Sequence, residues 1–411
     1  MRRFNGAAVA AAVVVTMVCA GCTRTVPPSE GPQSQQSTSL QSGTATPTID
    51  AEATALPFAL TVAPETVIST GQAVMAEPGE SYEVSGRTSG IVLPSTVLSD
   101  GSAFGIEREA PDSNSGNNPV TPGIFSPDGS FEALFEIAGP LRELPGSNPG
   151  HLEFRTQNSS AFGDWVVWRE GSAGGPQSVP TLESDDWRLV AWNRKTASVQ
   201  EVASAYLLHG ERSAPYATWD VAPTTDGQFV YFEASVPEGA QWVSSILSVP
   251  LNSPGDITQL GPGTTPFADQ RDGGVFFVRD NAVIKGDKTL FAINSDEWSI
   301  GKLTGSPDLL AVTVSNGDAA WLLVWDLAEQ TMLAAIDTGS DWAFPSVGAR
   351  TVVWGNGSGN GNPTMYRWDP DVALVEFGSL QGLSVPITNG TEVVFPVQEG
   401  ADIVWEFTTW D

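Results

Sequence analysis

Short hydrophobic runs separated by turn-forming residues fill the chain from about residue 57 onward. The runs are rich in β-branched and aromatic residues, and Gly, Pro, Asn or Asp bounds them. Examples are WVVW (165–168), FVYF (229–232), VFFV (275–278), WLLVW (321–325) and TVVW (351–354). Apolar positions at helical spacing are almost absent. The pattern therefore predicts an all-β fold.

The runs also repeat. One repeated element is a strand ending in Trp and a turn-forming residue, followed by a short turn and another strand, at 189–202, 322–336 and 365–377. A second element, a turn with Gly, Asn or Asp followed by a strand, precedes each hairpin, as at 224–232, 270–278, 346–354 and 387–395. Trp325, Trp368 and Trp410 lie 43 and 42 residues apart. A four-stranded unit that recurs every 40–45 residues is typical of a β-propeller.

The number of hairpins predicts the number of blades. Hairpins near residues 192, 251, 293, 325, 368 and 410 give six blades, and residues 70–160 leave room for a seventh. We expect seven four-stranded blades, with six or eight as alternatives. The hairpin at Trp410 stops before the outer strand of its blade. An N-terminal strand, Phe58–Val62 or Thr66–Ser69, is expected to complete that blade and close the ring.

Two turn motifs carry a family resemblance. The segment Ser126-Pro127-Asp128-Gly129 resembles the repeat of TolB-like propellers, and residues 225–232 are a looser copy. Four Trp-Asp dipeptides, at 219–220, 325–326, 368–369 and 410–411, resemble WD repeats, but the Gly-His partner of that motif is missing. The TolB-like resemblance covers about residues 65–411 and implies an architecture without implying a function. The separate N-terminal α/β domain of TolB has no counterpart, so the role of TolB in the Tol–Pal system does not carry over.

The N-terminus has the pattern of an export signal. Arg2 and Arg3 precede an uncharged apolar run that is too short to span a bilayer comfortably. The ending Ala20-Gly21-Cys22 resembles the lipobox of bacterial lipoproteins, although Cys19 stands where an aliphatic residue is usual. This resemblance implies a signal peptide over 1–21 and a lipid on Cys22. The alternative is ordinary secretion with cleavage after Ala20.

The composition changes at Cys22 and again at about residue 57. Residues 22–56 are rich in Ser, Thr, Pro and Gln and lack periodic apolar positions, which predicts a disordered tether. Residues 57–411 form the predicted propeller. Of the only two cysteines, Cys19 would leave with the signal peptide and Cys22 would carry the lipid, so we expect no disulfide and no cysteine-based metal site.

The charge of the chain limits its partners. The 48 Asp and Glu residues outnumber the 19 Lys and Arg residues, which gives a net charge of −29. Such a surface repels nucleic acid, so we expect no nucleic-acid partner. Asp-rich turns supply the oxygen ligands that Ca²⁺ prefers, but no EF-hand loop is present. We therefore expect no cofactor, with Ca²⁺ as the alternative.

No catalytic constellation stands out. Neither His151 nor His209 belongs to a recognisable triad or metal motif. The carboxylate pairs Asp185/Asp186, Glu107/Glu109 and Asp369/Asp371 are explained by chance and by turn preference. Six of the 14 Trp residues are expected to pack between blades, namely Trp165, Trp168, Trp192, Trp325, Trp354 and Trp368. Three others, Trp219, Trp298 and Trp342, are candidates for an exposed surface.

These observations favour a lipid-anchored propeller that faces the extracytoplasmic side of the cell membrane. Its expected role is a binding or protein-interaction module without catalytic residues. A glycan-active hydrolase or lyase that uses channel carboxylates is one alternative. A solute- or cation-binding accessory protein of an envelope complex is another. The expected partner is an envelope protein or a glycan. No residue of the sequence stands out as the one that binds it.

Overall fold

The computed structural model describes twelve stretches of the chain, namely residues 55–75, 81–84, 90–109, 120–134, 159–171, 187–210, 221–239, 241–356, 364–371, 373–379, 385–399 and 402–409. The signal region and nearly all of the tether lie outside these residues, as do His151, Asp185, Asp186, Trp219 and Trp410. The expectations for residues 1–54 therefore stay predictions.

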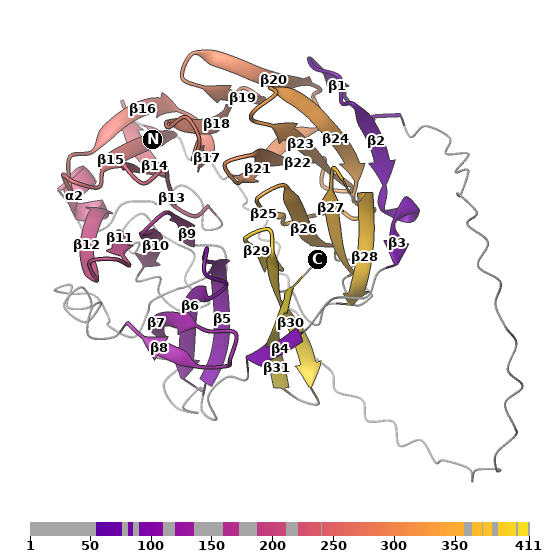
Figure 1. Ribbon diagram of the computed structural model, residues 1–411. Coiled ribbons are helices and arrows are strands. Elements are labelled where there is room, and N and C mark those ends of the chain that lie inside the picture. Colours follow the sequence, from indigo (N-terminus) through magenta and orange to yellow (C-terminus); the bar gives the residue numbers. More distant parts are fainter. Residues whose placement is uncertain are drawn as a thin grey trace, which may run out of the picture. The chain divides into compact units, whose positions relative to one another are not determined.

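Strands are nearly all of the regular secondary structure in the described residues, and they form seven sheets, which we call blades 1 to 7 (Figure 1). Within a blade the strands follow one another from the innermost to the outermost. Blade 1 contains β5 (Gly90–Val97), β6 (Ala103–Glu109), β7 (Val120–Phe125) and β8 (Phe131–Ala133). Blade 2 contains β9 (Ser159–Phe162), β10 (Trp165–Gly171), β11 (Trp187–Asn193) and β12 (Ser198–Ser204). Blade 3 contains β13 (Thr224–Thr225), β14 (Phe229–Glu238), β15 (Gln241–Pro250) and β16 (Thr258–Pro262).

The remaining four blades follow the same order. Blade 4 contains β17 (Thr264–Ala268), β18 (Val275–Arg279), β19 (Ala282–Lys285) and β20 (Lys288–Asn294). Blade 5 contains β21 (Ser299–Gly305), β22 (Leu309–Ser315), β23 (Ala320–Asp326) and β24 (Thr331–Asp337). Blade 6 contains β25 (Ser346–Gly348), β26 (Thr351–Asn356), β27 (Thr364–Asp369) and β28 (Ala373–Ser379). Blade 7 contains β29 (Ile387–Thr388), β30 (Glu392–Glu399) and β31 (Asp402–Thr409).

The innermost strands close a ring. Strand β5 contacts β9, and the contacts continue through β13, β17, β21, β25 and β29 back to β5. The predicted all-β propeller of seven blades is therefore confirmed. The described helices are short, α2 (Ala205–His209) and the 3-10 turn η1 (Thr70–Gln72).

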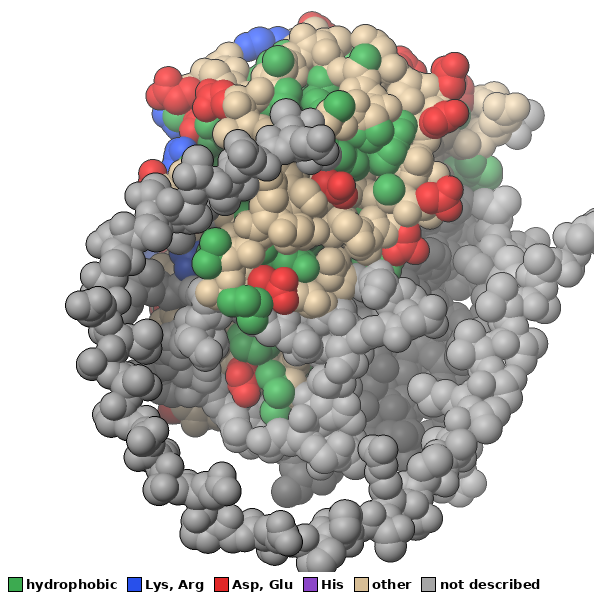
Figure 2. Space-filling view, turned by 90° about the vertical axis from the view of Figure 1, so that its right-hand side faces the viewer, with side chains coloured by type: hydrophobic (Ala, Val, Ile, Leu, Met, Phe, Trp, Pro, Cys, Tyr) green, Lys and Arg blue, Asp and Glu red, His purple; other side chains and the backbone are tan. Residues whose placement is uncertain are grey.

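The N-terminal segment runs along the outer edges of four consecutive blades, and we call it the N-terminal belt (residues 55–84). Strand β1 (Ala59–Leu60) pairs antiparallel with β20 of blade 4. Strands β2 (Thr66–Ser69) and β3 (Val74–Met75) pair parallel with β24 and β28 of blades 5 and 6. Figure 2 looks onto this side and shows acidic side chains scattered among hydrophobic and uncharged ones.

Strand β4 (Ser81–Val84) of the belt completes blade 7 by pairing antiparallel with β31. The predicted closure by an N-terminal strand is confirmed, but the two segments proposed for it were wrong. Phe58–Val62 and Thr66–Ser69 instead extend blades 4 and 5, which already have four strands. Strand β24 is the outermost strand of blade 5, and its free edge can pair with a further strand. Belt strand β2 therefore pairs with β24 before the belt reaches blade 7.

A second correction concerns blade 4. The hairpin expected near Ile293 lies earlier, because β19 and β20 pair through Lys285 and Lys288 around Gly286-Asp287. Asp280 and Asn281 both have positive φ angles, 49° and 58°, and join β18 to β19. Asp and Asn tolerate this conformation better than most residues. Blade 4 therefore has one tight turn between β18 and β19 and a second between β19 and β20, where the sequence predicted a single hairpin near Ile293.

Each interface between neighbouring blades has its own buried apolar cluster. Both faces of a central strand are covered, so all seven residues of β23 are buried. This double burial explains why the runs are continuously hydrophobic instead of alternating. At the interface of blades 6 and 7 the backbones approach closely: a Cβ on Gly348 would lie 2.0 Å from the carbonyl carbon of Asn389.

Candidate functional site: the central channel

The inner strands of the seven blades surround a cavity of about 380 Å³, which we call the channel. Hydroxyl residues contribute from nearly every blade: Ser95, Thr96, Ser99, Ser159, Ser160, Thr224, Thr265, Thr304, Ser306, Ser346 and Thr388. Small and apolar residues fill most of the remaining wall, for example Ala161, Val221, Gly305, Pro345 and Val385. The cavity is within the size range of small-molecule sites.

The charged residues on the described channel wall are Lys302 of β21 and Arg194. No Asp, Glu or His belongs to the described lining. Arg194 follows β11 and forms an ion pair with Asp100, which lies in the turn between β5 and β6 of blade 1. The Lys302 side chain is half-buried, and its backbone N–H donates to the Thr313 hydroxyl at 2.6 Å.

The hydroxyl groups of the wall fall into two kinds. Some donate to backbone carbonyls, as Ser160 does to Pro223 at 2.9 Å. Others accept a backbone N–H: Thr224 Oγ1 accepts from Ala268 at 3.1 Å, and Ser346 Oγ accepts from Thr388 at 3.1 Å. The latter bonds connect blade 3 to blade 4 and blade 6 to blade 7. The wall is therefore held in place by bonds between neighbouring blades.

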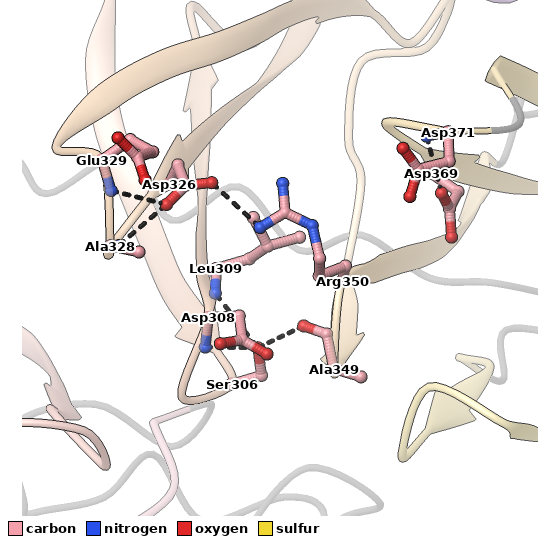
Figure 3. Close-up of polar contacts among 10 residues, drawn as sticks. All are labelled: Ser306, Asp308, Leu309, Asp326, Ala328, Glu329, Ala349, Arg350, Asp369 and Asp371. Carbon is pink, nitrogen blue, oxygen red and sulfur yellow. Dashed lines mark hydrogen bonds and ion pairs between the residues drawn. The ribbon is translucent and has the colours of Figure 1, made fainter.

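Turns at one end of the channel are locked by polar side chains. Ser306 Oγ accepts from the N–H groups of Asp308 and Leu309 and donates to the Ala349 carbonyl of the next blade at 2.5 Å (Figure 3). Asn389 caps the turn between β29 and β30 and donates to the Leu98 carbonyl of blade 1 at 2.9 Å. The turns that follow the inner strands thus connect adjacent blades around the channel.

The Trp-Asp dipeptides also serve this architecture. Asp326 follows Trp325 and accepts from the N–H groups of Ala328 and Glu329 in the turn between β23 and β24 (Figure 3). Its second oxygen accepts from the Arg350 guanidinium of blade 6 at 3.0 Å. Asp369 accepts from the Asp371 N–H in the same way, which confirms that these carboxylates belong to a turn.

Burial and hydrogen bonds act in opposite directions on Asp326. Burial alone raises the pKa of this carboxyl group. The N–H groups of Glu329 and Ala328 and the Arg350 guanidinium outweigh burial and hold its pKa below the ordinary value of 3.8. Between blades 3 and 4 the balance is different: burial, and then the charge of Asp226, raises the pKa of Tyr231 above its ordinary range.

The other residues considered from the sequence lie away from the channel. His209 ends α2, and its ring centroid is 5.2 Å from that of Trp242. Glu107 and Glu109 lie on β6, and only the side chain of Glu107 is described. No group of three or more His, Cys, Asp or Glu among the described residues could hold a metal ion. Within the same residues no helix is long and apolar enough to cross a membrane.

The expectations for tryptophan are mostly confirmed. Trp168, Trp192, Trp325, Trp354 and Trp368 are buried, and Trp165 is partly buried against the cluster between blades 2 and 3. Trp298 was expected on the surface but is only 6% exposed. Its ring centroid lies 5.1 Å from that of Phe58, because the N-terminal belt covers it. Trp342 is half-buried beside Phe344.

Sequence reasoning missed the channel residues. Lys302, Thr224 and Ser346 lie on inner strands that precede the repeated turns, so the position of each turn would have located them. Their residue types gave no signal, because Ser and Thr are also common in turns. Only the assembled ring brings these residues to one wall.

No protein-family model matches the chain, and no curated protein matches it either. Among solved structures, a prolyl endopeptidase is similar at 12% identity with a TM-score of 0.46, over 75% of this chain and 46% of the endopeptidase. TolB from Acinetobacter baumannii is similar at 11% identity with a TM-score of 0.36, over 72% of this chain and 61% of TolB. The acylaminoacyl peptidase of Pyrococcus horikoshii aligns at 9% identity with a TM-score of 0.42, over 81% and 54% of the two chains. The chain thus covers less than two thirds of each of these proteins, and likeness at this level carries nothing about activity.

Proposed function

We propose that this chain is an envelope lipoprotein whose propeller binds a partner or ligand at the central channel without catalysing a reaction. The observation that carries the proposal is the described channel wall, which consists of hydroxyl, small and apolar residues without a carboxylate. Glycosidases and related enzymes use a pair of carboxylates that face one substrate. A wall of hydroxyl and apolar groups instead suits recognition by shape and hydrogen bonds.

Binding at the channel can be tested by partner capture from envelope extracts. Thr304→Trp places a large side chain on the channel wall, whereas Thr258→Trp changes an exposed residue of the outer strand β16. We expect the wild type and Thr258→Trp to retain the same partner and Thr304→Trp to lose it. Capture that is unaffected by Thr304→Trp, or turnover of an envelope polysaccharide by the purified protein, contradicts the proposal.

The lipid anchor rests on the Ala20-Gly21-Cys22 ending and on the tether predicted over residues 22–56. The anchor would hold the propeller on the extracytoplasmic side, and the tether would separate it from the lipid head groups. We expect cells that express the wild type to incorporate labelled palmitate into the protein, and Cys22→Ser to abolish this label. Label that survives Cys22→Ser removes the lipoprotein part of the proposal and leaves the binding part intact.

A further inference from the structure

The outer strands of blades 3, 4 and 5 share one irregularity. In each strand the pairing register slips by one residue, and the extra residue is a leucine: Leu260 in β16, Leu290 in β20 and Leu333 in β24. Such a β-bulge bends the strand and re-aims the side chain of the extra residue. The three leucines therefore occupy equivalent positions at the rim of the ring.

The N-terminal belt covers this position in two of the three blades. Leu290 and the belt residue Leu60 are half-buried against the same apolar cluster. Leu333 and the belt residue Ile68 are half-buried against the next cluster, and the Leu333 carbonyl accepts from the Thr66 hydroxyl at 2.9 Å. In blades 4 and 5 an added strand thus pairs with the bulged outer strand and shares its apolar packing.

Blade 3 has the bulged leucine but lacks a belt strand. Strand β16 ends its sheet, and no described strand pairs with its outer edge (Figure 1). Leu260 is 42% exposed there. Proteins usually protect such edges with charged side chains. The outer strands β8 and β12 of blades 1 and 2 carry Glu132 and Glu201, whereas residues 258–262 of β16 carry no charge.

Other exposed apolar side chains lie in the same region. Six large hydrophobic residues are exposed in the described part of the chain, and four of them belong to blade 3 or to α2, namely Trp242, Leu260, Tyr206 and Leu207. Helix α2 lies against blade 3, because a Cβ on Gly255, in the turn that leads into β16, would be 3.8 Å from the Leu207 side chain. Exposed apolar groups that gather in this way mark interaction surfaces.

We propose that the outer edge of β16 binds an extended segment of a partner protein, which adds a fifth strand to blade 3 as the belt does to blades 4 and 5. The segment that fits is rich in β-branched and apolar residues, like Thr66–Ser69 of the belt, and covers Leu260 with one of them. Main-chain hydrogen bonds to the free edge supply affinity, and the bulged leucine fixes the register. No residue of β16 lines the described channel, so this surface is additional to the proposed function.

Fluorescence anisotropy on the whole protein tests the proposal. The probe is a labelled peptide of residues 56–70 (LPFALTVAPETVIST), the belt sequence that pairs with the equivalent edges of blades 4 and 5. We expect saturable binding, and Leu260→Lys should raise the Kd about tenfold or more, because it removes an apolar contact and places a charge on the edge. Replacing Val67 and Ile68 of the peptide by Pro should abolish binding, because Pro has no N–H for strand pairing.

The matched control is Val74→Lys, which places the same charge on an exposed apolar residue of the belt. It should leave the Kd unchanged, and both variants should keep the Tm of the wild type. The proposal is overturned if the wild type does not bind the peptide, if the Pro-substituted peptide binds equally well, or if Leu260→Lys and Val74→Lys weaken binding alike.

Two other occupants of the edge give different results, and either one overturns the partner segment. A dimer in analytical ultracentrifugation that Leu260→Lys dissociates would assign the edge to a second copy. Tighter, Leu260-dependent binding of a peptide of residues 41–54 would assign it to the chain's own N-terminal segment. Thr304→Trp should leave peptide binding unchanged, because a segment at this edge is a second partner, independent of the one expected at the channel.

Discussion

Single polar side chains in the turns connect neighbouring blades. Asp326 caps its own turn and binds Arg350 of the next blade, and Ser306 and Asn389 make equivalent connections elsewhere in the ring. Turn residues that also bond across an interface contribute twice, once to the local conformation and once to the assembly. The Trp-Asp dipeptide is thus a structural element of this propeller.

The charge of Asp326 should make stability depend on pH. Since its folded pKa is depressed, its contribution is complete above the ordinary pKa of 3.8 and is lost as pH falls through the lower folded value. Asp326→Asn keeps one capping oxygen and removes the charge that faces Arg350. We expect a loss of about 1–2 kcal/mol in the free energy of unfolding at pH 7, measured by urea denaturation.

The same pair of proteins gives the pH test. The difference in stability between wild type and Asp326→Asn should shrink as pH falls below about 4. Asp318→Asn, which changes an exposed carboxylate in the turn after β22, is the control and should change stability little at any pH. A difference that is constant from pH 7 to pH 3 would show that the charge of Asp326 has no part in stability.

At the scale of elements, the strands inside blades were predictable and the belt was not. Hydrophobic runs that end at Gly, Asn or Asp turns located most hairpins, because each turn needs those residues. Belt strands β1 and β3 have only two residues each, which is too short for any periodic pattern. The strands that pair with β1 and β3 come much later in the sequence. The positions of β1 and β3 therefore depend on free strand edges that exist only in the folded ring.

Phe58 connects the belt to the core. It is 7% exposed and packs against Trp298 and Trp321 at ring centroid distances of 5.1 and 6.1 Å. Phe58→Ala removes these contacts and leaves a cavity, so we expect a loss of about 3–5 kcal/mol. Val74→Ala is the control on the same belt, because Val74 is 63% exposed. Equal effects of the two substitutions on thermal unfolding would show that the belt is not anchored through Phe58.

At the scale of the whole molecule, the net charge of −29 should oppose the compact state. Acidic side chains are scattered over the described part of the face shown in Figure 2, and Lys and Arg side chains show along one edge of that view. Salt screens repulsion between exposed charges, with a Debye length of about 30 Å at 0.01 M and about 8 Å at 0.15 M. We therefore expect the Tm to rise when NaCl is increased from 0.01 to 0.15 M. A Tm that falls would mean that attractive ion pairs, such as that of Arg350 with Asp326, outweigh the net repulsion.

The repeat in the sequence predicted the seven blades and the closure of the ring by an N-terminal strand. It did not predict the channel. Its wall is made of one to four residues from each inner strand, and such residues are scattered over some 290 positions of the sequence. No local pattern distinguishes Ser346 on the wall from a serine in a loop. The exclusion of acidic residues from the wall becomes visible only when the ring is assembled.

The belt also determines when the ring can form during synthesis. Val84 pairs with Trp405, and Thr66 donates to the Leu333 carbonyl across 267 residues of sequence. At about 5–20 residues per second, β4 therefore waits on the order of 15–65 s after leaving the ribosome before its partner has been made. Strands β1, β2 and β3 can pair earlier, with β20, β24 and β28, whereas β4 has no partner until β31 has been made. Ring closure in this protein is accordingly a step that follows translation of β31.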